Sequence, residues 1–133
     1  MKKERGQEAM DEKFRKQLEE NGADVDTTVK RFMGNEAIYM KFIMKFLDDD
    51  NYDKLKANLK AGNFEETFNS AHTLKGVAAN LGIDPVSAVA AEISDLLRHK
   101  QADEVDVEKL DVLTEKLGEV YFRFKEILKA NKS

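Results

Sequence analysis

The sequence predicts an all-α protein, an antiparallel four-helix bundle with short additional helices at its N-terminus. Apolar residues recur every three to four positions over most of the chain, which is the period of an amphipathic helix. The 133 residues include one proline and no tryptophan, and 36% of them are charged, a composition that favours helix. No alternation of apolar and polar residues is long enough to indicate a strand. The connections are short, which predicts that consecutive helices run antiparallel.

The composition also limits the possible functions. A chain of this length fits one domain, which can fold without disulfides or metals. The absence of cysteine excludes disulfide frameworks, thiolate zinc sites and cysteine nucleophiles. The net charge of −4 arises from interleaved acidic and basic residues, which argues against a nucleic-acid surface. The charged N-terminus is followed by no apolar stretch, so we expect a cytoplasmic protein without signal peptide or membrane span, and a monomer.

We divide the chain into an N-terminal extension, residues 1–22, and a bundle, residues 23–131. The first residues, 1–7, are expected to be disordered. A weak amphipathic stretch follows and can form a short extra helix that ends at the turn Asn21-Gly22.

Two more helices are predicted before the acidic run at residues 48–50. Asp24 or Asp26 can cap a short helix that Gly34 ends. Asn35 opens a longer helix, whose wide apolar stripe predicts the first long arm of the bundle. This stripe consists of Ile38, Tyr39, Phe42, Ile43, Phe46 and Leu47.

The acidic run Asp48-Asp49-Asp50 interrupts the apolar pattern. Such a cluster could indicate a metal site, but consecutive carboxylates point in different directions and no spaced ligand loop follows. We therefore interpret it as a solvated helix end and expect no metal site. A shorter helix then runs to a stop at Gly62.

Asn63 and Glu66 have the spacing of a capping box, which predicts the start of a helix that Gly82 ends. On a helical wheel its small and apolar residues, Ala71, Leu74, Ala78 and Leu81, share one side. His72, Gly76 and Ala79 lie at the flank of that side, so we expect His72 to be exposed. Phe68, one turn before His72, can pack in the core or stay partly exposed as docking surface, and the core is the favoured interpretation.

Asp84-Pro85 predicts the next helix start, since aspartate can cap a helix and proline suits its first position. This helix should reach about Lys100, and after a polar connection a last long helix should span Val107 to Leu128. His99, the only other histidine, lies in the basic run that ends the first of these helices, and we assign it no chemistry.

His72, Lys75 and Gly76 together form a site that can carry a phosphoryl group. Residues three and four apart are neighbours on a helix, so Lys75 lies beside His72, and Gly76 lies above it with no side chain. A neutral histidine nitrogen can attack phosphorus and form a covalent intermediate. Lys75 can neutralise the phosphoryl oxygens, and its charge favours the neutral imidazole. A mid-helix glycine costs about 0.5–1 kcal/mol relative to alanine, so we interpret Gly76 as keeping the imidazole accessible.

The segment from Ala71 to Gly82 reads AHTLKGVAANLG. It resembles the signature of histidine phosphotransfer (HPt) domains, A-H-x-L-K-G-x-A-x-x-L-G, at every fixed position. Further features similar to the family are Phe32-Met33-Gly34-Asn35, Tyr39, Phe42, Phe46 and a helical tail ending near Tyr121. The resemblance covers about residues 25–128.

The resemblance implies a phosphorelay intermediate. Nε2 of His72 would accept a phosphoryl group from the phospho-aspartate of a response-regulator receiver domain and pass it to another receiver domain, with a sensor or hybrid histidine kinase upstream. The chain has no phosphate-binding loop and no second region that could bind a nucleotide, so we expect a phosphocarrier without its own ATP site rather than an enzyme. We expect no cofactor on this chain, with magnesium on the partner receiver domain, and we predict that Phe68 and Ala79 contact the partner.

Two other interpretations differ in their chemistry. A non-catalytic helical interaction module that binds a receiver domain or a kinase would have the same fold, and differs in whether His72 becomes phosphorylated. Metal-dependent hydrolysis has little support, because no helix bears paired ligand motifs of suitable spacing.

Overall fold

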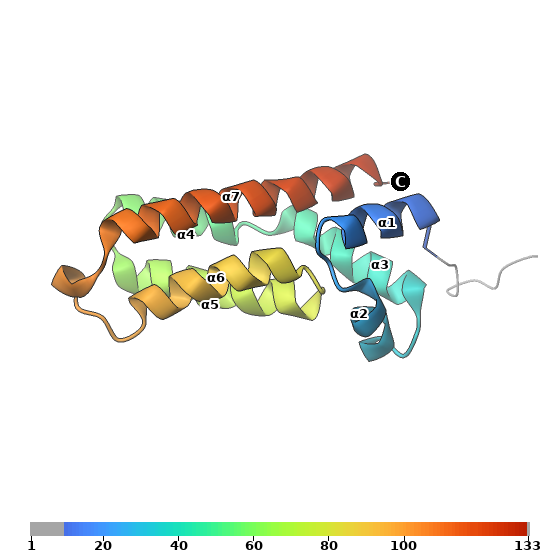
Figure 1. The fold of residues 1–133 in the computed structure, drawn as a ribbon, viewed down its shortest axis with the longest axis horizontal. Coiled ribbons are helices and arrows are strands. Elements are labelled where there is room, and N and C mark those ends of the chain that lie inside the picture. Colours follow the sequence, from blue (N-terminus) through green and yellow to red (C-terminus); the bar gives the residue numbers. More distant parts are fainter. Residues whose placement is uncertain (1–9, 133) are drawn as a thin grey trace, which may run out of the picture.

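The computed structural model describes residues 10–132, and within this range it contains helices and no strand (Figure 1). The elements are α1 (Glu12–Glu20), α2 (Val25–Arg31), α3 (Glu36–Met44), the 3₁₀ helix η1 (Lys45–Asp48), α4 (Asn51–Lys60), α5 (Phe64–Asn80), α6 (Asp84–Leu97), the 3₁₀ helix η2 (Ala102–Glu104) and α7 (Val107–Ala130). The disorder expected for residues 1–7 lies outside the described residues.

Four helices form the predicted bundle, which confirms the fold class. Helix α5 packs between α4 and α6, and α7 contacts both α6 and α4, so the four helices close around one core. The three N-terminal helices lie at the end of the bundle where α5 turns into α6 (Figure 1). Two hydrogen bonds connect them to that turn: the N–H of Asp24 donates to the carbonyl of Gly82 (2.8 Å), and the hydroxyl of Tyr39 donates to the carbonyl of Leu81 (3.1 Å).

The core is continuous from the N-terminal helices through the bundle. Phe14 and Leu18 of α1 are buried in it together with Leu117 and Phe124 of α7. Residues of the predicted N-terminal extension from Met10 onward therefore contribute apolar surface to the same core as the bundle.

The expected helix from Asn35 to Leu47 is two elements, α3 and η1, and it is not the first arm of the bundle. Helix α4 packs along α5 instead. Ile38 and Phe42 of the predicted core stripe are each 40% exposed. The helical run ends at Asp49, whose backbone is extended, and α7 contacts the chain at this point: the hydroxyl of Tyr121 and the ammonium of Lys125 donate to the carbonyl of Asp49.

Three details of the predicted helix ends are wrong. Asn63 does cap α5 by accepting from the N–H of Glu66 (3.1 Å), but the Glu66 carboxylate accepts from the side chain of Asn69 instead of completing a capping box. Asp84 is the first residue of α6 rather than its cap, and no side chain caps that helix. Helix α6 ends at Leu97, before the basic run, because the backbone of the next residue, Arg98, is not helical (ψ 123°), and His99 follows with a positive φ of 57°.

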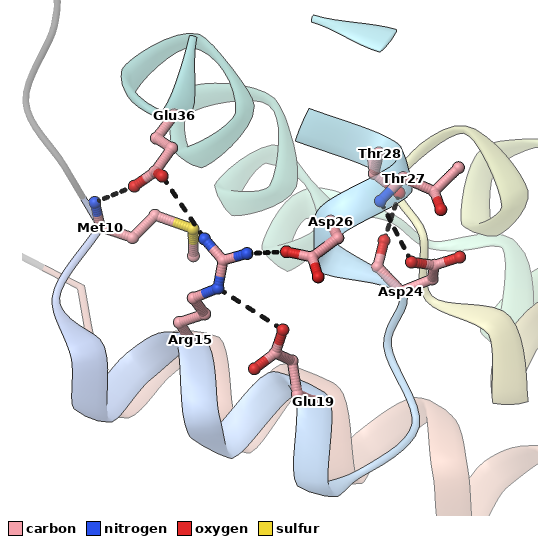
Figure 2. A network of polar contacts seen from close by, with 8 residues as sticks. All are labelled: Met10, Arg15, Glu19, Asp24, Asp26, Thr27, Thr28 and Glu36. Atoms are coloured by element: carbon pink, nitrogen blue, oxygen red, sulfur yellow. Dashed lines mark hydrogen bonds and ion pairs between the residues drawn. The ribbon is translucent and has the colours of Figure 1, made fainter. Parts of the chain in front are cut away.

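A network of ion pairs joins the N-terminal helices (Figure 2). The guanidinium of Arg15 on α1 contacts the carboxylates of Glu19, Asp26 and Glu36. Glu36 also accepts a hydrogen bond from the N–H of Met10 (2.6 Å). Arg15 thereby connects α1 to both α2 and α3.

Candidate phosphotransfer site

His72 lies in the middle of α5, and its side chain is exposed. The orientation of α5 follows from its small and apolar face, because Ala71, Leu74 and Ala78 are fully buried against the bundle. These residues are spaced three and four apart, so the helix turns His72 away from the core. The imidazole is open to a macromolecule that approaches α5 from solvent.

Gly76 lies one turn after His72, in open space. A Cβ built on Gly76 would have no heavy atom within 4 Å outside the helix's own backbone. At Gly118, by contrast, a Cβ would lie 2.4 Å from the hydroxyl of Tyr52. Packing within the protein therefore disfavours a side chain at position 118 and leaves room for one at position 76.

Lys75 lies beside His72 and is half-buried. Within residues 10–132 no carboxylate lies within 4.0 Å of its ammonium. Its backbone carbonyl accepts a hydrogen bond from the hydroxyl of Ser87 on α6 (3.0 Å). The positive charge is thus available to an incoming anion, while the backbone that carries it is attached to the neighbouring helix.

Phe68 is half-buried. This lies between the core position and the exposed docking position that the sequence left as alternatives. Its ring packs on the edge of the core and also stacks with the imidazole of His72, with centroids 5.8 Å apart and an interplanar angle of 14°. The residue that follows α6, Arg98, lies near the same ring: its guanidinium carbon is 5.4 Å from the centroid of the Phe68 ring.

Ala79 is exposed on α5, one turn beyond Lys75 and Gly76. Its backbone carbonyl accepts a hydrogen bond from Nη2 of Arg31 (3.0 Å), which places the end of α2 next to the end of α5. The structure therefore brings Phe68, His72, Lys75, Gly76 and Ala79 onto one helix, with α2 and α6 beside it.

Sequence reasoning missed Arg31, Ser87 and Arg98, which contact residues of α5 from other parts of the chain. For Ser87 a signal was available: the predicted turn at Gly82 makes a helical hairpin, in which residues at similar distances on either side of the turn meet. The sequence shows Arg98 only as part of the basic run Arg98-His99-Lys100, and it gives no local signal for Arg31.

His99 lies in the loop after α6, outside any helix. It borders a pocket of about 370 Å³ together with Phe68 and Arg98. Among the residues from 10 to 132, no group of three or more His, Asp or Glu side chains is arranged to hold a metal ion. In the same part of the chain no helix combines the length and the apolar character that a membrane crossing requires.

Comparison with known proteins gives a family for this fold and site. The model of the Hpt domain family matches residues 48–121, which include α4, α5, α6 and more than half of α7. Neither the search of curated proteins nor that of solved structures returned a significant match. Because the family match spans more than half of the 133 residues, the chain belongs to the Hpt domain family, the phosphotransfer domains of two-component systems.

Proposed function

We propose that this protein is a phosphorelay intermediate that carries a phosphoryl group on His72. Hpt domains are phosphocarriers without a kinase site and interact with receiver domains and kinases. The observation that carries the proposal for this chain is the open space above His72: the imidazole is exposed, and the next helical position on that face, Gly76, presents no side chain.

In the proposed reaction the lone pair of Nε2 of His72 attacks the phosphorus of a receiver's phospho-aspartate in line with the bond that breaks. A P–N bond forms, and the aspartate leaves with the electron pair of the P–O bond as a carboxylate. The other ring nitrogen carries the proton during the attack. The reverse reaction, onto the aspartate of a second receiver, discharges the histidine.

Lys75 is proposed to neutralise charge on the transferred phosphoryl oxygens. Lys75 lies one turn from His72 on α5, and its ammonium has no carboxylate partner within residues 10–132, so no internal ion pair must be broken before it binds the phosphoryl group. Phe68 and Ala79 flank the site on the same helix, and their exposed parts are proposed to contact the receiver domain.

The magnesium ion is proposed to be bound by the partner receiver domain, and the chain itself is proposed to use no cofactor. The phosphoryl group would originate from a sensor or hybrid histidine kinase. Since such kinases use ATP, we place the relay in the cytoplasm.

The test is incubation with a receiver domain carrying ³²P on its aspartate. We expect acid-labile, base-stable label on the wild-type protein and none on His72→Gln. Loss of that label when a second, unphosphorylated receiver is added would establish the relay. Binding of the phosphorylated receiver without any label transfer would overturn the proposal and identify a non-catalytic interaction module.

A further inference from the structure

Phe68 lies between His72 and Arg98, the residue that directly follows α6. The rings of Phe68 and His72 are nearly parallel, at 14°, with centroids 5.8 Å apart. The guanidinium carbon of Arg98, at the end of α6, lies 5.4 Å from the centroid of the Phe68 ring. A guanidinium within about 6 Å of an aromatic centroid is attracted by the ring quadrupole. We call these three side chains the His72–Phe68–Arg98 stack.

Arg98 is itself restrained at the other end of the stack. Its Nη2 lies 3.5 Å from the hydroxyl of Ser94, which is fully buried, and 3.6 Å from the carboxylate of Asp95. Both partners belong to α6, whose packing against α5 is the most extensive in the bundle. The Arg98 side chain is 39% exposed, and these two contacts link its guanidinium to α6, which packs against the helix that carries His72.

We infer that Arg98 is a positioning residue for His72 and that it acts through the ring of Phe68. An exposed imidazole can occupy several rotamers, whereas in-line attack on phosphorus requires one orientation of the attacking nitrogen. The Phe68 ring restricts the imidazole from one side, and Arg98 restrains the Phe68 ring. This inference rests on the proposed function for its kinetic consequence, but the ring orientation can be measured independently.

The specific chemistry of arginine matters for this role. A planar guanidinium stacks on an aromatic ring over a wide contact area, while an ammonium interacts as a compact, strongly hydrated charge. Arg98→Lys should therefore keep the local charge and lose part of the restraint. Arg123, an exposed arginine of α7, provides a matched control for loss of a positive charge.

A double-mutant cycle tests the route through Phe68. The rate of His72 phosphorylation is measured with a small phosphodonor, phosphoramidate, so that receiver docking has no influence. We expect Arg98→Ala to lower the rate about two- to fivefold, Arg98→Lys to lower it less, and Arg123→Ala to leave it unchanged. In a Phe68→Leu background, Arg98→Ala should have no further effect. An equal reduction in both backgrounds would show that Arg98 does not act through Phe68 and would overturn the inference.

NMR of the imidazole keeps the inference separate from the proposed function. The Phe68 ring current should displace the carbon-bound proton resonances of His72 in the unphosphorylated protein. Arg98→Ala should move them toward their positions in Phe68→Leu, with the melting temperature nearly unchanged. Identical His72 resonances in wild type and Arg98→Ala would refute the positioning role. If neither the wild type nor any variant accepted a phosphoryl group while the resonances moved as expected, the proposed relay function would be refuted. The positioning of His72 by Phe68 and Arg98 would still be supported.

Discussion

The hydroxyl of Ser87 on α6 lies 3.0 Å from the backbone carbonyl oxygen of Lys75 on α5 and donates a hydrogen bond to it. The carbonyl belongs to a residue one turn after His72, so the contact attaches the centre of the site helix to its neighbour. Both helices also bury small residues, Ala78 on α5 and Ala90 on α6, and the two helices pack against each other.

Ser87→Ala should lower the free energy of unfolding by about 0.5–1 kcal/mol, the usual net contribution of one neutral hydrogen bond. Urea denaturation measures this. The rate of phosphoryl transfer should change little, because the helix backbone retains its own hydrogen bonds. Unchanged stability would show that the contact contributes nothing to packing of the hairpin.

His72→Gln should abolish acceptance of the phosphoryl group and leave the free energy of unfolding within about 0.5 kcal/mol of wild type, because the side chain is exposed. Labelling and thermal melting measure the two effects. The control is His99→Asn, chosen because asparagine tolerates the positive φ found at His99. The control should accept label normally, and label on the His72 variant would place the site elsewhere.

Gly76→Ala should raise the free energy of unfolding by up to about 1 kcal/mol, since alanine is the better helix former and its Cβ meets open space. Gly118→Ala should do the opposite, because its Cβ would collide with Tyr52. Denaturant unfolding of the pair tests the contrast.

Gly76→Gln should slow transfer from a receiver domain much more than transfer from a small phosphodonor. The longer side chain obstructs a macromolecule but leaves room for a small molecule. Rates with the two donors, compared in the same variant, measure this. Equal losses with both donors would mean that the glycine does not act through partner access.

Lys75→Ala should slow transfer and shorten retention of the phosphoryl group, with little change in affinity for the unphosphorylated receiver, since a single rim charge contributes little to binding. Lys75→Arg should retain part of the rate because it keeps the charge in a different geometry. Stopped-flow transfer and a separate binding titration measure the two quantities, with Lys116→Ala on α7 as the control. An unchanged transfer rate with strongly weakened binding would identify Lys75 as a docking residue.

Tyr121→Phe removes the hydroxyl that donates hydrogen bonds to Asp49, the residue that follows η1. Burial raises the pKa of Tyr121 above its usual value of 10.0, and the hydrogen bond to the Asp49 carboxylate raises it further. Below about pH 10 the phenol is protonated in both the folded and the unfolded state, so its stabilising contact is fully present. There the variant should be less stable by about 1–2 kcal/mol.

Above pH 10 the unfolded wild-type chain loses the Tyr121 proton first, so the contribution of this residue decreases as the pH rises toward its folded pKa. The stability difference between wild type and Tyr121→Phe should therefore narrow in alkali. Urea denaturation at a series of pH values measures the difference. A difference that stays constant above pH 10 would contradict the assigned role of the Tyr121 hydroxyl.

Much of this protein can be predicted from local sequence. The helix starts at Asn35 and Asn63 and the stop at Gly82 follow from the chemistry of single residues, since capping side chains and a positive φ act within one turn. The exposure of His72 follows in the same way, because a residue's position relative to the apolar stripe depends only on helical periodicity.

The sequence by itself therefore determined the helical class, the starts of α3 and α5, the stop at Gly82 and the face on which His72, Lys75 and Gly76 lie. Only the tertiary structure decided that α4 rather than α3 packs along α5, that Phe42 stays partly exposed, and that Ser87 and Arg98 reach the site helix. The physical reason is the range of the interactions. Periodicity and capping act between residues a few positions apart, whereas these contacts join segments whose relative placement depends on how all the helices fill one core.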